Sequence, residues 1–179
     1  FVAVMTMLEP GDELIYMVPN YLQIRGIARS FGITVKELPL HEELGWQWDI
    51  NELESMITSK TKMIAVCHPN NPTGAIVSED NMKNIIEIAS KNNCWILSDE
   101  VYRGAELNGV ESPSFYGTYD KIIVNAGLSK AYRLPGLRIG WTTGPEDYIK
   151  KAWAFHDYTS ISIAYHSDWV ASRVLDTKR

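Results

Sequence analysis

The sequence predicts an α/β fold, with a mostly parallel sheet and helices on both faces in an α/β/α sandwich. Short apolar runs that suit strands alternate with segments whose apolar residues recur at helical spacing. Several strand-like runs, such as residues 62–67 and 93–98, are apolar without alternation, which is typical of parallel strands buried on both faces. The 179 residues, 45% of them hydrophobic, suffice for one domain with a sizeable core and are too few for two ordinary domains.

In the first half of the chain, residues that stop regular structure set the boundaries of the expected elements. Pro10-Gly11 ends the first helix, Pro19-Asn20 breaks the first strand, and Gly32 ends the second helix. Asp49, with Glu52 three residues later, matches a capping box that starts a third helix. The expected elements are a helix over 1–8, a strand over 13–18, a helix over 21–31, a strand over 33–38, a surface connection over 41–48 and a helix to about residue 56.

The second half continues the same alternation. The strand over 62–67 ends in a turn over 68–74 that contains two prolines, and Ser78 caps the helix that follows. Residues 104–118 combine glycine, proline and serine with little periodicity, so we expect a loop there. The remaining expected elements are strands over 93–98, 121–125 and 138–142 and helices over 146–158 and 162–175.

Charge and cysteine content point to a small-molecule partner and a reducing compartment. The net charge of -5 and the lack of a Lys/Arg run argue against nucleic acid or an anionic membrane as the main partner. Cys67 and Cys94 each sit inside an apolar run, which suits buried thiols better than a disulfide. Because no apolar run reaches the roughly 20 residues of a membrane span and no signal-peptide order is present, the sequence predicts a cytoplasmic protein.

Polar side chains that can carry chemistry gather near the ends of the expected strands. Asn71, Asp99 and Lys130 each come shortly after a strand, at the edge where parallel sheets bind ligands. Tyr102 follows Asp99 by three residues, and Arg138 begins the next strand. Each alone has an ordinary structural role, as a turn, a helix cap, a solvated lysine or a surface ion pair. Together they indicate a binding site.

These groups have complementary chemistry. A lysine amine that attacks a carbonyl is held firmly and partly desolvated, so that its pKa falls. A carboxylate at the end of an apolar strand needs a cation or strong donors, and the planar guanidinium of arginine suits a phosphate. Pyridoxal 5'-phosphate uses this set together: a lysine for the Schiff base, a carboxylate for the ring nitrogen, donors for the ring oxygen and a cation for the phosphate.

Three segments resemble motifs of the fold type I pyridoxal phosphate-dependent enzymes, specifically the class I/II aminotransferases of the aspartate aminotransferase superfamily. They are Asn70-Asn71-Pro72-Thr73-Gly74, Ser98-Asp99-Glu100-Val101-Tyr102, and Ser129-Lys130 followed eight positions later by Arg138. The segments occur in the family's order. The resemblance implies that residues 1–179 are part of the large cofactor-binding domain, and that 160–179 begin the connection to a C-terminal small domain.

The resemblance also implies a role for each residue around the cofactor ring. Lys130 would form the Schiff base and, once released, move a proton between the substrate α-carbon and the cofactor. Asp99 would pair with the ring nitrogen, and Asn71 and Tyr102 would hydrogen-bond the ring oxygen. Tyr21 stands where the family often has an aromatic residue that stacks on the ring; the alternative is a tyrosine at a helix start that packs on the core.

The phosphate site departs from the family pattern. By the resemblance, Arg138 would hold the phosphate. Many family members have a serine or threonine three positions before the lysine as a further phosphate ligand, and this position is Gly127 here. We therefore expect Ser129 or main-chain groups to take its place. The set implies no metal ion.

The function implied by the resemblance is an aminotransferase of amino acid metabolism. It would interconvert an α-amino acid and a 2-oxo acid by a ping-pong Schiff-base mechanism, as a homodimer. The alternatives are a decarboxylase, lyase or synthase of the same superfamily, and a non-catalytic aminotransferase-like sensor domain of a regulator. The family's phosphate-capping loop and the arginine that binds the substrate carboxylate lie outside these residues, so we expect the fragment alone to be inactive.

Overall fold

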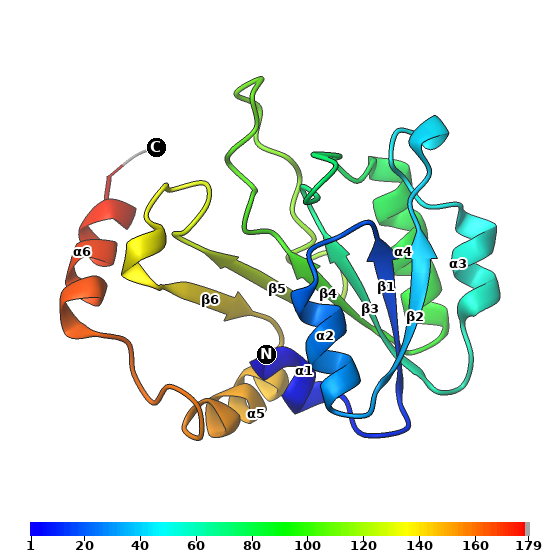
Figure 1. Cartoon of the computed structure of the whole chain (residues 1–179), viewed down its shortest axis with the longest axis horizontal. Coiled ribbons are helices and arrows are strands. Elements are labelled where there is room, and N and C mark those ends of the chain that lie inside the picture. The colour runs from blue at the N-terminus through cyan, green and yellow to red at the C-terminus, as the bar shows by residue number, and fades with distance from the viewer. Residues whose placement is uncertain (178–179) are drawn as a thin grey trace.

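The computed structural model describes residues 1–177, which form one six-stranded sheet with helices on both faces (Figure 1). The strands are β1 (Glu13–Val18), β2 (Thr34–Pro39), β3 (Thr61–Cys67), β4 (Trp95–Asp99), β5 (Ile122–Gly127) and β6 (Gly140–Thr143). They lie in the order β2-β1-β3-β4-β5-β6. Strands β1 to β5 pair in parallel, and β6 runs antiparallel to β5. The predicted α/β fold with a mostly parallel sheet is confirmed.

The helices form two layers, one on each face of the sheet. They are α1 (Val2–Met7), α2 (Gln23–Ser30), α3 (Ile50–Met56), α4 (Glu79–Lys91), α5 (Glu146–His156) and α6 (Tyr165–Leu175), with short 3-10 helices η1 (Glu42–Leu44) and η2 (Pro135–Leu137). Helices α3 and α4 share one buried core with the sheet, and α1, α2 and α5 share the other. Helix α6 lies beyond β6 at one end of the molecule (Figure 1).

Strand β1 shows why the sheet's apolar runs do not alternate with polar residues. Leu14 and Tyr16 pack in the core with α1, α2 and α5, whereas Ile15 and Met17 pack in the core with α3 and α4. All four side chains are at most 2% exposed. Burying a side chain of this size stabilises a fold by about 1.5–3 kcal/mol. Both faces of the strand therefore select apolar residues.

Helix boundaries follow the sequence with local differences. The Asp49 carboxylate caps α3 by accepting the main-chain N–H groups of Asn51 at 2.7 Å and Glu52 at 3.3 Å. In a complete capping box the Glu52 carboxylate would accept the main-chain N–H of Asp49. Here it instead contacts Nε2 of His41 at 2.8 Å. Ser78 caps α4 as predicted.

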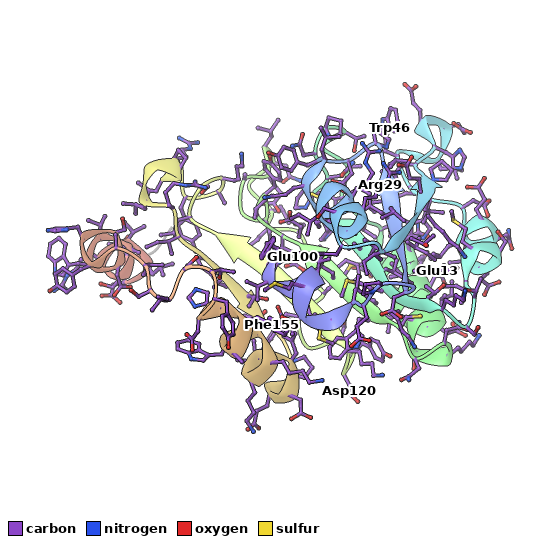
Figure 2. The ribbon with its side chains drawn as sticks, turned by 60° about the horizontal axis from the view of Figure 1, so that its bottom comes forward. Glu13, Arg29, Trp46, Glu100, Asp120 and Phe155 are labelled. Atoms are coloured by element: carbon purple, nitrogen blue, oxygen red, sulfur yellow. The ribbon has the colours of Figure 1, made fainter. Side chains whose placement is uncertain are left out.

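The loop predicted over residues 104–118 contains no helix or strand, and a buried carboxylate holds it against the sheet. Glu100, which is 3% exposed, accepts hydrogen bonds from the hydroxyls of Ser98 at 3.1 Å and Ser114 at 2.7 Å. It also accepts the main-chain N–H of Phe115 at 2.9 Å. Glu100 lies near the middle of the molecule (Figure 2).

The C-terminal part of the described chain contains α6. It belongs to the segment 160–179, predicted to begin a connection to a further domain, of which Lys178 and Arg179 lie outside the described residues. None of the helices within residues 1–177 combines the length and the apolar character needed to cross a membrane.

Candidate active site

A cleft with a volume of about 380 Å³ lies at the carboxyl ends of the central strands. This size is typical of small-molecule sites. Adjacent parallel strands end at one edge of the sheet, which brings together side chains that are far apart in the sequence. All the residues that the sequence predicts for the site line this cleft: Tyr21, Asn71, Asp99, Tyr102, Ser129, Lys130 and Arg138.

The sheet register sets the floor of the cleft. Cys67 of β3 stands opposite Asp99 of β4, and Asp99 stands opposite Asn125 of β5. Asp99 is the last residue of its strand rather than the first residue after it. Its carboxylate accepts the main-chain N–H of Val101 at 3.2 Å. Burial raises the pKa of Asp99, because the charged form loses water, and the Val101 hydrogen bond and the Lys130 charge oppose this effect.

An amide, a phenol and an amine from three different connections form one wall. Asn71 Nδ2 donates to the Tyr102 hydroxyl oxygen at 3.2 Å. The Lys130 ammonium lies 5.5 Å from the centre of the Tyr102 ring, a cation–π contact. Lys130 is exposed, which differs from the partly desolvated amine that the sequence predicts.

Arg138 and Ser129 also line the cleft and contact each other. Arg138 Nη1 donates to Ser129 Oγ at 3.3 Å and to the main-chain oxygen of Pro135 at 2.8 Å. The prediction that Arg138 lies in a strand is wrong, since β6 begins at Gly140 and Arg138 ends η2 with φ 57° and ψ 39°. This left-handed conformation costs a non-glycine residue roughly 1–2 kcal/mol. Because β6 is antiparallel to β5, its first residues meet the last residues of β5, which brings Arg138 back to Ser129.

Gly127 has no room for a side chain. A Cβ atom here would lie 2.9 Å from the main-chain oxygen of Ile139 and 3.1 Å from Cα of Gly140. The two strands approach closely at this point, where Gly127 pairs with Gly140. The missing hydroxyl at position 127 therefore has a packing cause, and Ser129 supplies a hydroxyl beside Arg138.

Tyr21, Cys67 and Gln23 also line the cleft. Tyr21 is 59% exposed and lines the cleft, so the alternative in which it packs on the core is wrong. Cys67 was predicted only as a core residue and also lines the cleft floor. Burial raises the pKa of the Cys67 thiol to about 12, so the thiol stays protonated. Gln23, the first residue of α2, lines the cleft as well, and nothing in the sequence pattern indicates it.

The chemical groups suit a ligand with a cationic ring, a ring oxygen, a carbonyl and a phosphate. The partly buried Asp99 carboxylate favours a cation beside it, since its charged form is poorly solvated. The Asn71 and Tyr102 pair offers donors, and the Arg138 and Ser129 pair offers a cation with a hydroxyl. Within the described part of the chain, no three or more His, Cys, Asp or Glu side chains are grouped to hold a metal ion.

Known proteins are similar to this chain in sequence and in fold. The chain is 35% identical over 155 residues to the probable aspartate/prephenate aminotransferase of Aquifex aeolicus, a match that covers 84% of this chain and 39% of that protein. It is 27% identical over 153 residues to the capreomycidine synthase of Streptomyces vinaceus, which covers 86% of this chain and 39% of that protein. The chain thus spans 39% of the length of both relatives.

Structural and family comparisons agree with these matches. A crystal structure of a PLP-dependent aminotransferase from Streptococcus suis superposes with a TM-score of 0.89 at 38% identity, covering 95% of this chain and 45% of that chain. The model of the family "Aminotransferase class I and II" matches residues 1–177. The chain therefore belongs to the class I and II aminotransferase family.

Proposed function

We propose that the intact protein is a pyridoxal 5'-phosphate-dependent aminotransferase that interconverts an α-amino acid and a 2-oxo acid by a ping-pong mechanism. The observation that carries this proposal is the convergence of Lys130, Asp99 and the Asn71–Tyr102 pair on one cleft, in a chain of this family. When bound, pyridoxal phosphate supplies an aldehyde that takes up the amino group and a ring that withdraws electrons.

The floor and wall of the cleft provide the groups that such a reaction needs. The Asp99 carboxylate would lie against the ring nitrogen and keep it protonated, because burial makes a neighbouring cation favourable. The Tyr102 oxygen accepts from Asn71, so the Tyr102 proton is available to the ring oxygen. Lys130 would attach the cofactor covalently and, once released, hold and move the proton at the substrate α-carbon.

Arg138 and Ser129 would bind the phosphate. Ser129 Oγ accepts a hydrogen bond from Arg138, so the serine proton can be donated to an anion that the guanidinium also contacts. Tyr21, at the cleft edge, would stack on the ring. Gly127 contributes no side chain. Within residues 1–179, the proposed side-chain ligands of the phosphate are therefore Ser129 and Arg138.

The wider setting follows by analogy with the family. We propose a homodimer, with amino acids and 2-oxo acids as substrates, and residues 160–179 as the start of the connection to a C-terminal small domain. We also propose a cytoplasmic location, which the two buried free thiols of Cys67 and Cys94 support. Residues 1–179 alone are expected to bind the cofactor weakly and to turn over no substrate.

The test is a visible absorbance titration of the full-length protein with pyridoxal phosphate. The wild type is expected to gain a bound-cofactor band, to lose it to the amine form with an amino acid and to regain it with a 2-oxo acid. Lys130→Ala should lose the band, whereas the matched control Lys121→Ala should keep it, since Lys121 contacts Asn93 and Trp95. A Lys130→Ala protein that still gives a borohydride-trapped adduct would refute the assignment.

Rate measurements separate the roles of Asp99 and Tyr102. Asp99→Ala removes the charge that keeps the ring nitrogen protonated, and we expect kcat to fall by on the order of 10²-fold or more. Tyr102→Phe removes one hydrogen bond and is expected to cost about tenfold. Equal losses in the two variants would contradict these roles.

A second candidate is a lyase, decarboxylase or synthase that uses the same cofactor. It is favoured by the similarity to a protein named capreomycidine synthase. This candidate predicts product formation without conversion of the cofactor to its amine form. The absorbance titration distinguishes the two, because only transamination leaves the amine form after the first half-reaction.

A further inference from the structure

The loop that leaves β1 carries Tyr21 to the cleft. Tyr21 precedes α2, which begins at Gln23, and its side chain is 59% exposed. A side chain so exposed has few packing neighbours to fix it. Its position at the cleft therefore depends on how the main chain of the loop is held.

Three hydrogen bonds hold this main chain. The Tyr16 hydroxyl donates to the main-chain oxygen of Tyr21. The Tyr21 N–H donates to Asn20 Oδ1 at 2.6 Å, and Asn70 Nδ2 donates to the main-chain oxygen of Pro19 at 3.1 Å. Of these three, the Tyr16 bond is the one that ties Tyr21 itself to the sheet, because Asn20 belongs to the same loop and Asn70 reaches only Pro19.

Tyr16 is built into the rigid part of the molecule. It lies in the middle of β1, paired with Ala65 of β3, and is 1% exposed in the core beneath α1, α2 and α5. Burial raises the pKa of Tyr16, and the nearby Cys67 and Asp99 raise it further. The hydroxyl therefore remains a donor across the physiological pH range, and a donor so buried is costly to leave unpaired.

We propose that Tyr16 is a positioning residue whose hydroxyl holds the main chain of Tyr21, so that the Tyr21 ring stays against the cleft. The inference rests on the proposed function, because the ring is useful there only when a ligand binds. Tyr16 is not part of the cleft lining and acts through Tyr21. This assigns to the core of β1 a role in cofactor binding.

The test uses the full-length protein with Tyr16→Phe, which removes one oxygen atom and keeps the ring in the core. The matched control is Tyr148→Phe. Tyr148 is also 1% exposed in the same core, and its hydroxyl contacts Thr142 at 2.9 Å rather than a cleft residue. We expect Tyr16→Phe to weaken pyridoxal phosphate binding about five- to tenfold, the scale of one hydrogen bond, and Tyr148→Phe to leave it unchanged.

Two further measurements distinguish positioning from a general loss of stability. In the apoprotein, hydrogen exchange of the Tyr21 amide should speed up in Tyr16→Phe and not in Tyr148→Phe. In a Tyr21→Ala background, Tyr16→Phe should have no further effect on pyridoxal phosphate affinity, because the ring that Tyr16 positions is gone.

These experiments test the role of Tyr16 separately from the proposed function. Unchanged exchange at Tyr21, unchanged affinity in Tyr16→Phe, or an equal further loss in the Tyr21→Ala background would overturn the role of Tyr16. A wild-type protein that fails to bind pyridoxal phosphate would contradict the proposed function instead. The exchange measurement needs no cofactor, so it tests the hold on Tyr21 in that case as well.

Discussion

Replacing Gly127 by serine tests whether strand packing sets the residue at this position. The new Cβ atom would lie 2.9 Å from the Ile139 oxygen and 3.1 Å from Gly140 Cα, and Cβ atoms essentially never approach within 3.0 Å of another atom. The main chain of residues 139–140 has to move by a few tenths of an ångström. Overpacking of this kind costs about 1–3 kcal/mol. Because Arg138 adjoins the segment that moves, we expect lower stability and no gain in phosphate affinity, even though a hydroxyl has been added.

The measurements are urea unfolding of the full-length apoprotein and its affinity for pyridoxal phosphate. A lower unfolding midpoint at an unchanged slope would report the lost stability. Gly136→Ala is the matched control, because a Cβ atom at Gly136 meets no atom within 4 Å, and its cost should stay within about 0.5 kcal/mol. A Gly127→Ser protein as stable as Gly136→Ala, with tighter cofactor binding than the wild type, would refute the reasoning.

The remaining predictions concern charge and backbone conformation. Asp99→Asn should stabilise the apoprotein at neutral pH, since burial raises the pKa of Asp99 above its ordinary 3.8 and the wild type loses stability as the pH rises through that raised pKa. Urea midpoints of both proteins at about pH 4 and pH 7 measure this, and parallel midpoints would contradict it. Arg133→Gly should raise the unfolding free energy by about 1 kcal/mol, because Arg133 has a φ of 58°, and a lower melting temperature would contradict this. The hydrogen bond that His41 donates to the Glu52 carboxylate raises the pKa of His41, so its stabilisation is complete below the unfolded pKa of about 6.5 and is lost as the pH rises through the folded pKa. His41→Gln should remove this pH dependence from the urea midpoint.

The sheet could be predicted because burial on both faces leaves a clear trace in the sequence. The apolar run from Met63 to Cys67 has no polar face to interrupt it. The strand β3 spans Thr61–Cys67, and the sequence predicts 62–67. Asp99 lies at the carboxyl end of β4, and Lys130 follows the carboxyl end of β5. They meet in one cleft because β4 and β5 are parallel neighbours in the sheet.

Features that depend on contacts between distant segments were not predictable. Nothing in residues 138–142 indicates that β6 runs antiparallel, since its direction depends on the left-handed Arg138 and on the close approach of Gly127 to Gly140. Nothing in the sequence around Lys130 indicates that its side chain is exposed. The bond from Tyr16 to the main chain of Tyr21 follows neither a helical nor a strand period.

The reversal between β5 and β6 places Lys130 and Arg138 on a single connection, residues 128–139. A cofactor attached at one and bound through its phosphate at the other would be anchored at both ends to one short piece of backbone. Movements of other parts of the intact protein would then leave the distance and direction from Lys130 to Arg138, and so the line between the two attachment points, unchanged. The remaining freedom would be rotation of the ring about that line, and Asp99, from β4, and Tyr21, from the loop after β1, would have to limit this rotation.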